Sequence, residues 1–473
     1  MSLSKAYLAL IAVLLLGYAF LGKGFAYIGY APVYVGELSL AAGLFVFMAG
    51  GGSFMVFRSS ITRAILAFAL WGALNTLPYL DTYGVLALRD GVVWAYAAFA
   101  LTVAAALLRT GLIERTLAWY GRWLPWFLIW APIAFLVHAL YRDALPLIPG
   151  SQIFVLTVKG GDFAVHLAGA AAFLALGLHR RFPRRAGAWA WLTEWGCWLF
   201  WSVGFLAVGA KSRGGLLAML AALAVVMVLR PANRLHRLLL AGIVIFALVI
   251  ALDVKIPLGG DREMSPQQIF ANFESIFFET RRPELRGTIE WRFQWWRMIL
   301  DYTAFGDHFW TGKGYGINLA DSDGFQVVWE GSPLRSPHNS HLTFLARSGV
   351  PGLALWALLQ ATVFFSLLRA HFRARRAGQP VLANVNLWVL AYWMAFIVNM
   401  TFDVYLEGPQ GGIWFWSLIG FAIALTEAEK PKVPAPSRSP PARALAGGGF
   451  PSGGRSEARQ QEGDESWFVR KRL

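Results

Sequence analysis

Residues 6–22 read AYLALIAVLLLGYAFLG, a run without a single charged side chain. An apolar helix of about 17–25 residues is long enough to cross the hydrocarbon core of a bilayer, which is about 30 Å thick. The whole chain has 473 residues, of which 57% are hydrophobic and only 15% charged. Soluble domains carry about 25% charged residues. The composition therefore excludes a single soluble globular domain and predicts a polytopic membrane protein.

Further apolar ranges follow the first one along the chain, and together they predict an all-α fold with about twelve transmembrane helices. The predicted ranges are 6–22, 34–57, 61–80, 90–108, 119–141, 162–179, 188–208, 214–230, 235–252, 339–368, 382–402 and 411–426.

The distribution of basic residues between these ranges predicts the orientation of the chain. If the N-terminus is cytoplasmic, the cytoplasmic connections carry far more Arg and Lys than the short connections on the outside. The outside connections hold only Lys23, Arg89, Arg142, Lys159, Lys211 and Arg213. This bias is the one that the positive-inside rule describes, and an even number of crossings returns the C-terminus to the cytoplasm. The cytoplasmic basic residues also account for the net charge of +15, so we expect no nucleic-acid partner.

The predicted spans divide the chain into four parts. Residues 1–252 are expected to form transmembrane helices 1–9, and residues 338–426 to form helices 10–12. Between them, residues 253–337 contain no uninterrupted apolar span and are expected to fold as one large periplasmic loop. Residues 427–473 are rich in Pro, Ser, Gly, Arg and Glu, a composition that predicts a disordered cytoplasmic tail.

Within the predicted loop, residues 287–302 read GTIEWRFQWWRMILDY. Ile289, Arg292, Trp296 and Ile299 are three or four positions apart and share one face of a helix. The neighbouring Trp291, Trp295 and Trp296 are typical of the membrane–water boundary, where indole rings lie at headgroup level. We therefore expect an amphipathic helix that lies on the membrane surface.

A helix start is predicted where the loop re-enters the membrane, at Ser336-Pro337-His338-Asn339. Ser336 is expected at the N-cap and Pro337 at the first helical position, which places His338 in the first turn. The positive end of the helix dipole disfavours imidazolium, so His338 suits a general base. The alternative interpretation is a histidine that anchors the boundary by hydrogen bonds.

Lys211, Ser212 and Arg213 form a very short outside turn between two predicted spans. A cation such as Arg213 beside the amide-rich N-terminus of a helix is favoured when an anion lies between them, and a phosphate is the natural candidate. A phosphate is likewise a candidate ligand of Arg292, on the amphipathic helix. For both arginines the alternative is snorkelling of a long basic side chain to the membrane boundary.

Other candidate motifs carry less information. The stretch Gly312–Gly316 (GKGYG) is interpreted as a tight turn, because no strand precedes it. Glu194 lies near the cytoplasmic end of its predicted helix, where structural pairing is expected. The single Cys197 excludes an intrachain disulfide. His308 and His341 lack the spacing of a metal site, so we predict no metal and no other cofactor.

Four motifs in order along the chain resemble those of the O-antigen ligase family of bacterial envelope enzymes. They are Ser212-Arg213, Glu290-Trp291-Arg292 with Trp295, Gly312-x-Gly314-x-Gly316, and His338-Asn339 followed by Gly349-x-x-Gly352. The resemblance implies a GT-C-like fold in which Arg213 and Arg292 bind pyrophosphate and His338 is the catalytic residue. Lys211, Asn339 and Glu290 are expected to support them.

The family resemblance also implies the reaction and its location. A glycan carried on undecaprenyl pyrophosphate is transferred to the lipid A–core oligosaccharide of lipopolysaccharide, at the periplasmic face of the bacterial inner membrane. The expected partners are thus a lipid-linked glycan donor, a lipid-anchored acceptor and the surrounding membrane lipid. Guanidinium groups bind phosphate oxygens bidentately and stay protonated, so they suit an inverting transfer without a metal.

Three other functions are compatible with the sequence. An O-antigen polymerase or a protein O-oligosaccharyltransferase would use the same donor chemistry with a different acceptor. A transporter or flippase for lipid-linked sugars belongs to another class, for which about twelve helices is a common count. No internal repeat is evident, and few ionisable residues lie in the middle of the predicted spans, which argues against transport.

Overall fold

The computed structural model describes residues 2–50, 54–181, 188–230, 234–252, 255–257, 263–277, 283–329 and 332–429. Within these ranges the fold is almost entirely helical. The described β structure consists of three short antiparallel pairs. They are β1 (Gly29–Tyr30) with β2 (Val33–Tyr34), β3 (Ile256–Pro257) with β4 (Glu263–Met264), and β5 (Val328–Trp329) with β6 (Ser332–Pro333).

Each predicted apolar range contains at least one helix. The helices are α1 (Leu3–Leu21), α2 (Lys23–Ala26), α3 (Val35–Ala49), α4 (Phe54–Phe57), α5 (Ser60–Thr76), α6 (Leu80–Tyr83), α7 (Val85–Ala95), α8 (Ala97–Thr110), α9 (Ile113–Tyr141), α10 (Gly160–Ala175), α11 (Ala188–Lys211), α12 (Arg213–Leu229), α13 (Leu235–Ala251), α14 (Pro266–Phe277), α15 (Pro283–Thr303), α16 (Leu319–Asp323), α17 (Ser340–Arg376), α18 (Pro380–Asn399) and α19 (Pro409–Ala428). Short 3₁₀ turns are η1 (Leu77–Tyr79), η2 (Arg142–Ala144) and η3 (Leu178–Arg180).

Six helices in the described part of the chain are long and apolar enough to cross a membrane. They are α1, Ser60–Tyr83, Ile113–Ala144, α17, α18 and α19, and the bent pair α7–α8 makes a seventh if it is one span. The apolar helices α3, α10, α12 and α13 have 15, 16, 17 and 17 residues. These findings agree with a polytopic helical membrane protein, whereas the count of about twelve spans stays a prediction.

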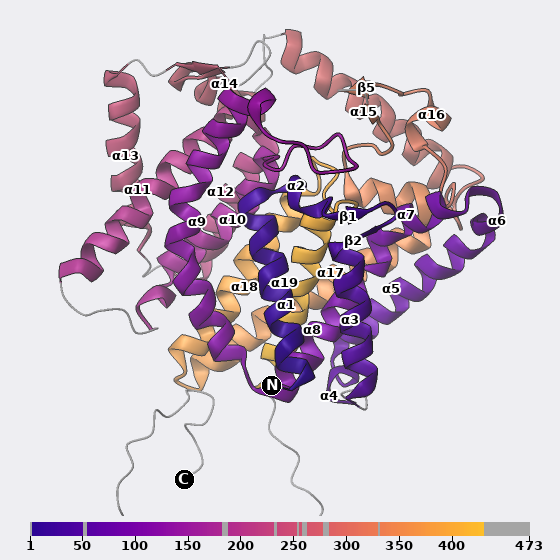
Figure 1. Ribbon diagram of the computed structural model, residues 1–473, viewed down its shortest axis with the longest axis horizontal. Helices are drawn as coiled ribbons and strands as arrows, with labels where there is room; N and C mark the ends of the chain where they lie inside the picture. The colour runs from indigo at the N-terminus through magenta and orange to yellow at the C-terminus, as the bar shows by residue number, and fades with distance from the viewer. Residues whose placement is uncertain are drawn as a thin grey trace, which may run out of the picture.

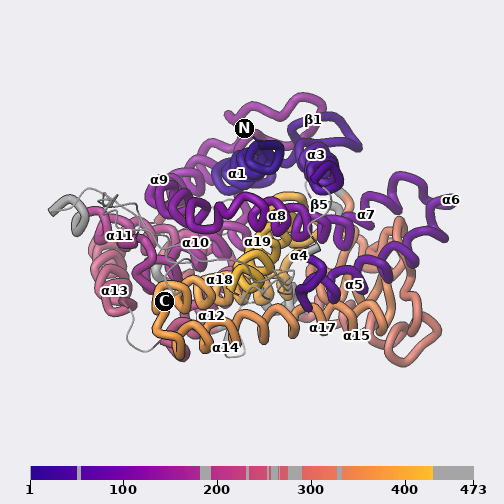
Figure 2. Tube along the Cα trace, turned by 90° about the horizontal axis from the view of Figure 1, so that it is seen from below, coloured from indigo at the N-terminus to yellow at the C-terminus, as the bar shows by residue number. Residues whose placement is uncertain are grey.

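The centre of the bundle is formed by α10, α18 and α19. Every residue of α10 is buried, and α18 and α19 are buried over most of their length. Helices that are apolar on all sides are expected inside a bundle. Figure 2 shows α1, α8 and α9 on one side of this centre and α12 and α17 on the other.

The two ends of the bundle differ in character (Figure 1). One end, here called the terminal end, carries the start of α1 and the end of α19. The other, called the loop end, carries α14, α15 and residues 400–408 between α18 and α19. The indole Nε1 of Trp414, near the start of α19, donates to the Leu15 carbonyl near the end of α1 over 3.0 Å. These two helices therefore run in opposite directions.

The helix α17 is broken near the loop end. Gly349 has φ 67° and ψ −171°, outside the helical region, and the next residue, Val350, donates its N–H to the Phe309 carbonyl (2.7 Å). Glycine adopts positive φ without the steric cost that other residues meet. The break separates the short first part of α17 from the long part that is able to span a membrane.

The amphipathic helix predicted at 287–302 is observed as α15, but one of its tryptophans was assigned to the wrong environment. Trp295 and Ile299 are fully buried in a small core of the loop region. The Trp295 ring stacks on Phe325, and its Nε1 donates to Asp323 over 2.7 Å. Trp295 therefore packs inside the protein instead of lying at lipid headgroup level, because α16 and the segment after it fold back over α15.

The structural pairing expected for Glu194 is present near the terminal end. This carboxylate is 3% exposed and lies between His179 (3.2 Å), Arg234 (3.3 Å), Arg180 and Arg237. A buried carboxylate needs such partners to offset its lost hydration. Glu194 therefore links α11 to η3 and to the start of α13, away from the loop end.

Candidate functional site

Residues 400–408, which connect α18 to α19 at the loop end, are the point where two of the predicted site residues meet. Arg292 on α15 donates from Nη1 to the Phe402 carbonyl over 3.1 Å. The Asp403 carboxylate lies 3.7 Å from Nδ1 of His338. Arg292 and His338 are thus held by adjacent residues of the same segment.

Arg213 belongs to a helix whose first turn packs against this segment. The Ser212 hydroxyl accepts from the N–H of Gly215 (3.1 Å), so Ser212 is the N-cap and Arg213 is the first residue of α12. A Cβ on Gly214 would lie only 2.7 Å from the Cβ of Phe402. The absence of a side chain at Gly214 therefore permits a close approach, and Arg213 starts its helix beside Phe402.

His338 does not lie in the first helical turn, as the sequence predicts, but just before the helix. Asn339 is the N-cap, since its side chain accepts from the Leu342 N–H (3.1 Å), and α17 begins at Ser340. Nε1 of Trp296 donates to the Pro337 carbonyl (2.8 Å), which holds this proline outside the helix. Ser336 is therefore not the cap.

The backbone of His338 is unusual. Its φ is 52°, in the left-handed region that residues other than glycine rarely adopt. Such conformations cost about 1–3 kcal/mol and persist where the surroundings enforce them, often at functional sites. The side chain is 30% exposed, and its Nδ1 is buried without a hydrogen-bond partner. The imidazole therefore turns a buried Nδ1 toward Asp403, at 3.7 Å, while part of the ring stays accessible.

Asp403 is a site residue that the sequence analysis missed. Burial raises the pKa of this carboxyl, but the Lys159 ammonium (Nζ–Oδ1 4.0 Å), the neighbouring His338 and the N–H of Val404 lower it by more, to about 2. Asp403 in turn raises the pKa of Lys159. The site thus contains an ionised carboxylate between a lysine and the histidine. Its only sequence signal is its place in an outside connection directly after a predicted span.

One N–H donor of Arg292, at Nε, makes no hydrogen bond. Burial lowers the pKa of this guanidinium, partly offset by Asp403, and its Nε is buried without a hydrogen-bond partner. A buried donor without a partner costs about 1–3 kcal/mol, and a ligand oxygen would satisfy it. The pattern favours an anion next to Arg292.

The predicted supporting residues lie in three different settings. Asn339 is used as the cap of α17. The Lys211 ammonium lies 5.4 Å from the centre of the Phe135 ring. Glu290 is exposed on α15. Asn339 thus has a structural role at the start of the helix that follows His338.

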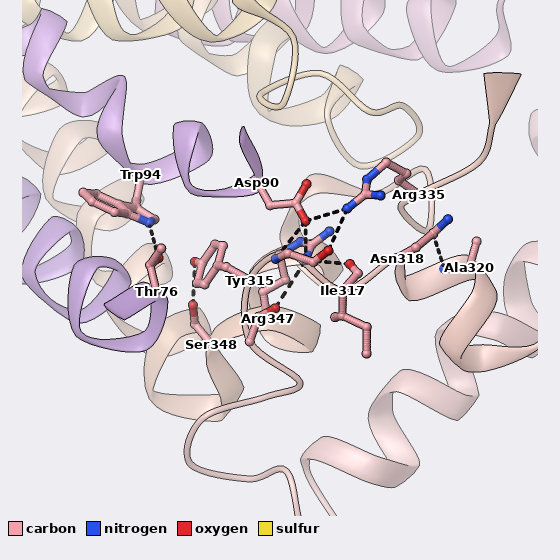
Figure 3. A network of polar contacts seen from close by, with 12 residues as sticks. Thr76, Asp90, Trp94, Tyr315, Ile317, Asn318, Ala320, Arg335, Arg347 and Ser348 are labelled. Atoms are coloured by element: carbon pink, nitrogen blue, oxygen red, sulfur yellow. Dashed lines mark hydrogen bonds and ion pairs between the residues drawn. The ribbon is translucent and has the colours of Figure 1, made fainter. Parts of the chain in front are cut away.

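A second polar network is built around Asp90 of α7 and joins that helix to the stretch before α17 (Figure 3). The Asp90 carboxylate accepts hydrogen bonds from Arg335 Nη2 and the Gly316 N–H and forms an ion pair with Arg347 Nη1, each over 3.0 Å. Arg347 is only 1% exposed and also donates to the carbonyls of Gly314 and Ile317. The glycine-rich stretch is therefore wrapped around a buried arginine.

The glycines of this stretch allow that wrapping. Gly312, Gly314 and Gly316 have φ of 62°, 80° and 100°. A Cβ on Gly314 would lie 2.1 Å from the Tyr79 ring. The stretch is thus a tight turn, as predicted, that packs on η1 and α17.

Glu407 connects the second network to the 400–408 segment. Burial raises the pKa of this carboxyl, while the charge of Arg347 lowers it. Like Asp403, Glu407 was missed because its sequence neighbourhood carries no motif. Asp403 comes near His338, and Glu407 near Arg347, only through the packing of the 400–408 segment against the start of α17.

Replacing Asp90 by alanine is expected to destabilise the protein by about 3–5 kcal/mol, because the buried Arg347 would lose its counter-charge. The expected readout is a lower melting temperature in detergent. Asp81→Ala, which removes an exposed carboxylate from α6, is the matched control and should leave the melting temperature unchanged. The double variant Asp90→Leu with Arg347→Met should recover part of the loss. Equal melting of Asp90→Ala and wild type would contradict a structural role for the network.

No group of three or more His, Cys, Asp or Glu side chains that could hold a metal ion occurs among the described residues.

One family model matches the part of the chain that contains the three predicted site residues. Residues 198–357 match the family model described as O-antigen ligase. The matched part extends from α11 into α17 and contains Arg213, Arg292 and His338, together with the glycine-rich turn. The resemblance predicted from the sequence motifs is thereby confirmed. No curated protein matches the chain.

Proposed function

We propose that this chain, which carries an O-antigen ligase region at residues 198–357, is an inverting, metal-independent glycosyltransferase. In this proposal it ligates O-antigen glycan from undecaprenyl pyrophosphate onto lipid A–core oligosaccharide. The observation that supports it most is the convergence of Arg292 and His338 on residues 400–408, which include Asp403, beside the start of the helix that carries Arg213.

In this proposal the two arginines stabilise the leaving group. Transfer breaks the bond between sugar C1 and a phosphate oxygen, so negative charge grows on the departing pyrophosphate. Arg292 offers its unpartnered Nε, and Arg213 stands at a helix N-terminus, where backbone N–H groups also favour an anion. Preorganised donors of this kind stabilise the charge that develops in the transition state.

The histidine serves the nucleophile. An acceptor hydroxyl needs to lose its proton as it attacks C1, and His338 is the proposed acceptor of that proton. Asp403 faces Nδ1 of His338, so it orients the ring and stabilises the imidazolium that forms. Attack on C1 from the side opposite the pyrophosphate inverts the anomeric configuration.

The proposal includes an orientation in the bacterial inner membrane. The loop end faces the periplasm, the terminal end faces the cytoplasm, and about twelve helices cross the bilayer. The bias of basic residues in the sequence supports this orientation, as does the cluster of arginines around Glu194 near the terminal end. Lipid-linked donor and acceptor would then reach the site sideways from the bilayer.

Reconstitution of the purified chain tests the proposed reaction. The donor is an undecaprenyl-pyrophosphate glycan, the acceptors are rough lipopolysaccharide or a pilin-type peptide, and EDTA is present throughout. Glycan transfer to lipopolysaccharide is the expected result. Extension of the donor glycan itself would indicate a polymerase, and transfer to the peptide a protein glycosyltransferase. Loss of all transfer in EDTA, restored by a divalent cation, would contradict the metal-free reaction.

A further inference from the structure

A basic cavity lies at the terminal end, away from the site described above. It has a volume of about 260 Å³, is open on one side, and is bordered by the start of α5, the last turns of α17 and the end of α19. Four arginines line it, Arg58, Arg63, Arg369 and Arg373, together with hydroxyl side chains and a single carboxylate, Glu427. The cavity is therefore strongly positive and has room for a phosphate group with several waters.

The arginines converge from two helices. On α17, Arg369 and Arg373 are four residues apart on the same face, where like charges repel. Arg58 and Arg63 flank the N-terminus of α5, where the helix dipole is also positive. Arg373 faces one carboxylate, Glu429, at 3.8 Å. An anion inside the cavity would relieve both the repulsion between arginines and the unfavourable position beside α5.

Ser59 provides a second, independent feature of the cavity. It occupies the N-cap position of α5 and is only 2% exposed, but its hydroxyl makes no capping hydrogen bond. The first backbone N–H groups of α5 therefore donate no capping hydrogen bond to the Ser59 hydroxyl. A phosphate oxygen in the cavity can accept both from the Ser59 hydroxyl and from these amides.

We propose that this cavity binds the phosphate headgroup of an anionic phospholipid. Along both helices, the exposed side chains change from arginine to apolar residues within about two turns. On α5, Leu70 is 62% exposed, and on α17, Phe365 and Leu358 are 49% and 57% exposed. This order matches the boundary of a bilayer, where headgroups give way to acyl chains. The cavity thus holds a headgroup while the apolar side chains contact the lipid tails.

Native mass spectrometry of the purified full chain tests this site. Phosphatidylglycerol or phosphatidylcholine is added to the detergent micelles, and bound lipid is counted for each variant. Arg63→Gln with Arg369→Gln removes two charges from the cavity. Arg115→Gln with Arg376→Gln, two exposed arginines outside the cavity lining, makes the same charge change as a control. A third arm adds inorganic phosphate to the wild-type chain and to both double variants.

The wild-type chain should retain phosphatidylglycerol in preference to phosphatidylcholine. The cavity variant should retain roughly tenfold less phosphatidylglycerol, because each basic residue near an anionic lipid contributes appreciably to binding. The control variant should resemble wild type, and millimolar phosphate should leave lipid binding unchanged. Equal losses in both variants would attribute the binding to bulk charge and overturn the proposal. If the cavity variant loses bound inorganic phosphate but retains as much phosphatidylglycerol as wild type, the ligand of the cavity is a free anion and the proposal is overturned.

Discussion

Replacing His338 by asparagine is expected to lower glycan transfer by about 100- to 10,000-fold, the usual contribution of a general base. Asparagine is the appropriate substitution, since it tolerates the left-handed backbone that His338 adopts (φ 52°). His338→Ala removes the same imidazole but adds backbone strain. The two variants should be equally inactive if the imidazole is what matters. Transfer is measured with purified protein, donor and rough lipopolysaccharide.

His308→Ala is the control for this experiment. His308 lies in the same loop region, where its Nδ1 contacts the Gly312 carbonyl (3.2 Å). Its loss should leave transfer close to wild type. Wild-type transfer by His338→Asn would refute the base assignment. If His338→Asn is active and His338→Ala is inactive, backbone strain, and not the loss of proton transfer, explains the inactivity of His338→Ala.

Replacing Arg292 or Arg213 by lysine is expected to lower the rate of transfer by about 100- to 1,000-fold. Lysine keeps the charge but loses the forked geometry that binds phosphate oxygens bidentately, and loss of one preorganised donor has an effect of about this size. The effect should fall mainly on the rate at saturating donor, because the charge on pyrophosphate develops in the transition state.

Arg297→Lys supplies the matched comparison. Arg297 is exposed on the same helix, α15, and its replacement should leave the rate unchanged. Equal rates for Arg292→Lys, Arg213→Lys and wild type would remove the arginines from the proposed chemistry. Because Arg292 also bonds the Phe402 carbonyl, melting temperatures need to be compared, and they should change little in either lysine variant.

The helices were predictable from the sequence, whereas the contacts between them were not. Apolar runs such as 382–402 and 411–426 are local signals, and each contains a helix in the structure. Asp403 and Glu407 lie between these two runs without any motif around them. Their importance arises from Lys159, His338 and Arg347, which come from distant parts of the chain.

Two predictions failed for reasons that are physical. Both Ser336 and Asn339 are good N-caps, and the choice depends on Trp296, which bonds the Pro337 carbonyl and excludes that residue from the helix. Trp295 has an apolar ring and one polar N–H, which suits a lipid boundary as well as a protein interior. The sequence pattern is the same in both settings, and only the packing of Phe325 against Trp295 distinguishes them.

The proximity of Arg292 to Phe402 and of His338 to Asp403 has a consequence for how this connection can evolve. Surface connections commonly accept added or deleted residues, because little depends on their register. Here, the Phe402 carbonyl and the Asp403 carboxylate serve two different parts of the proposed chemistry, so a single inserted residue would separate them by one peptide unit and break one of the two contacts. Length variation among related chains is therefore expected to be tolerated elsewhere and avoided between α18 and α19.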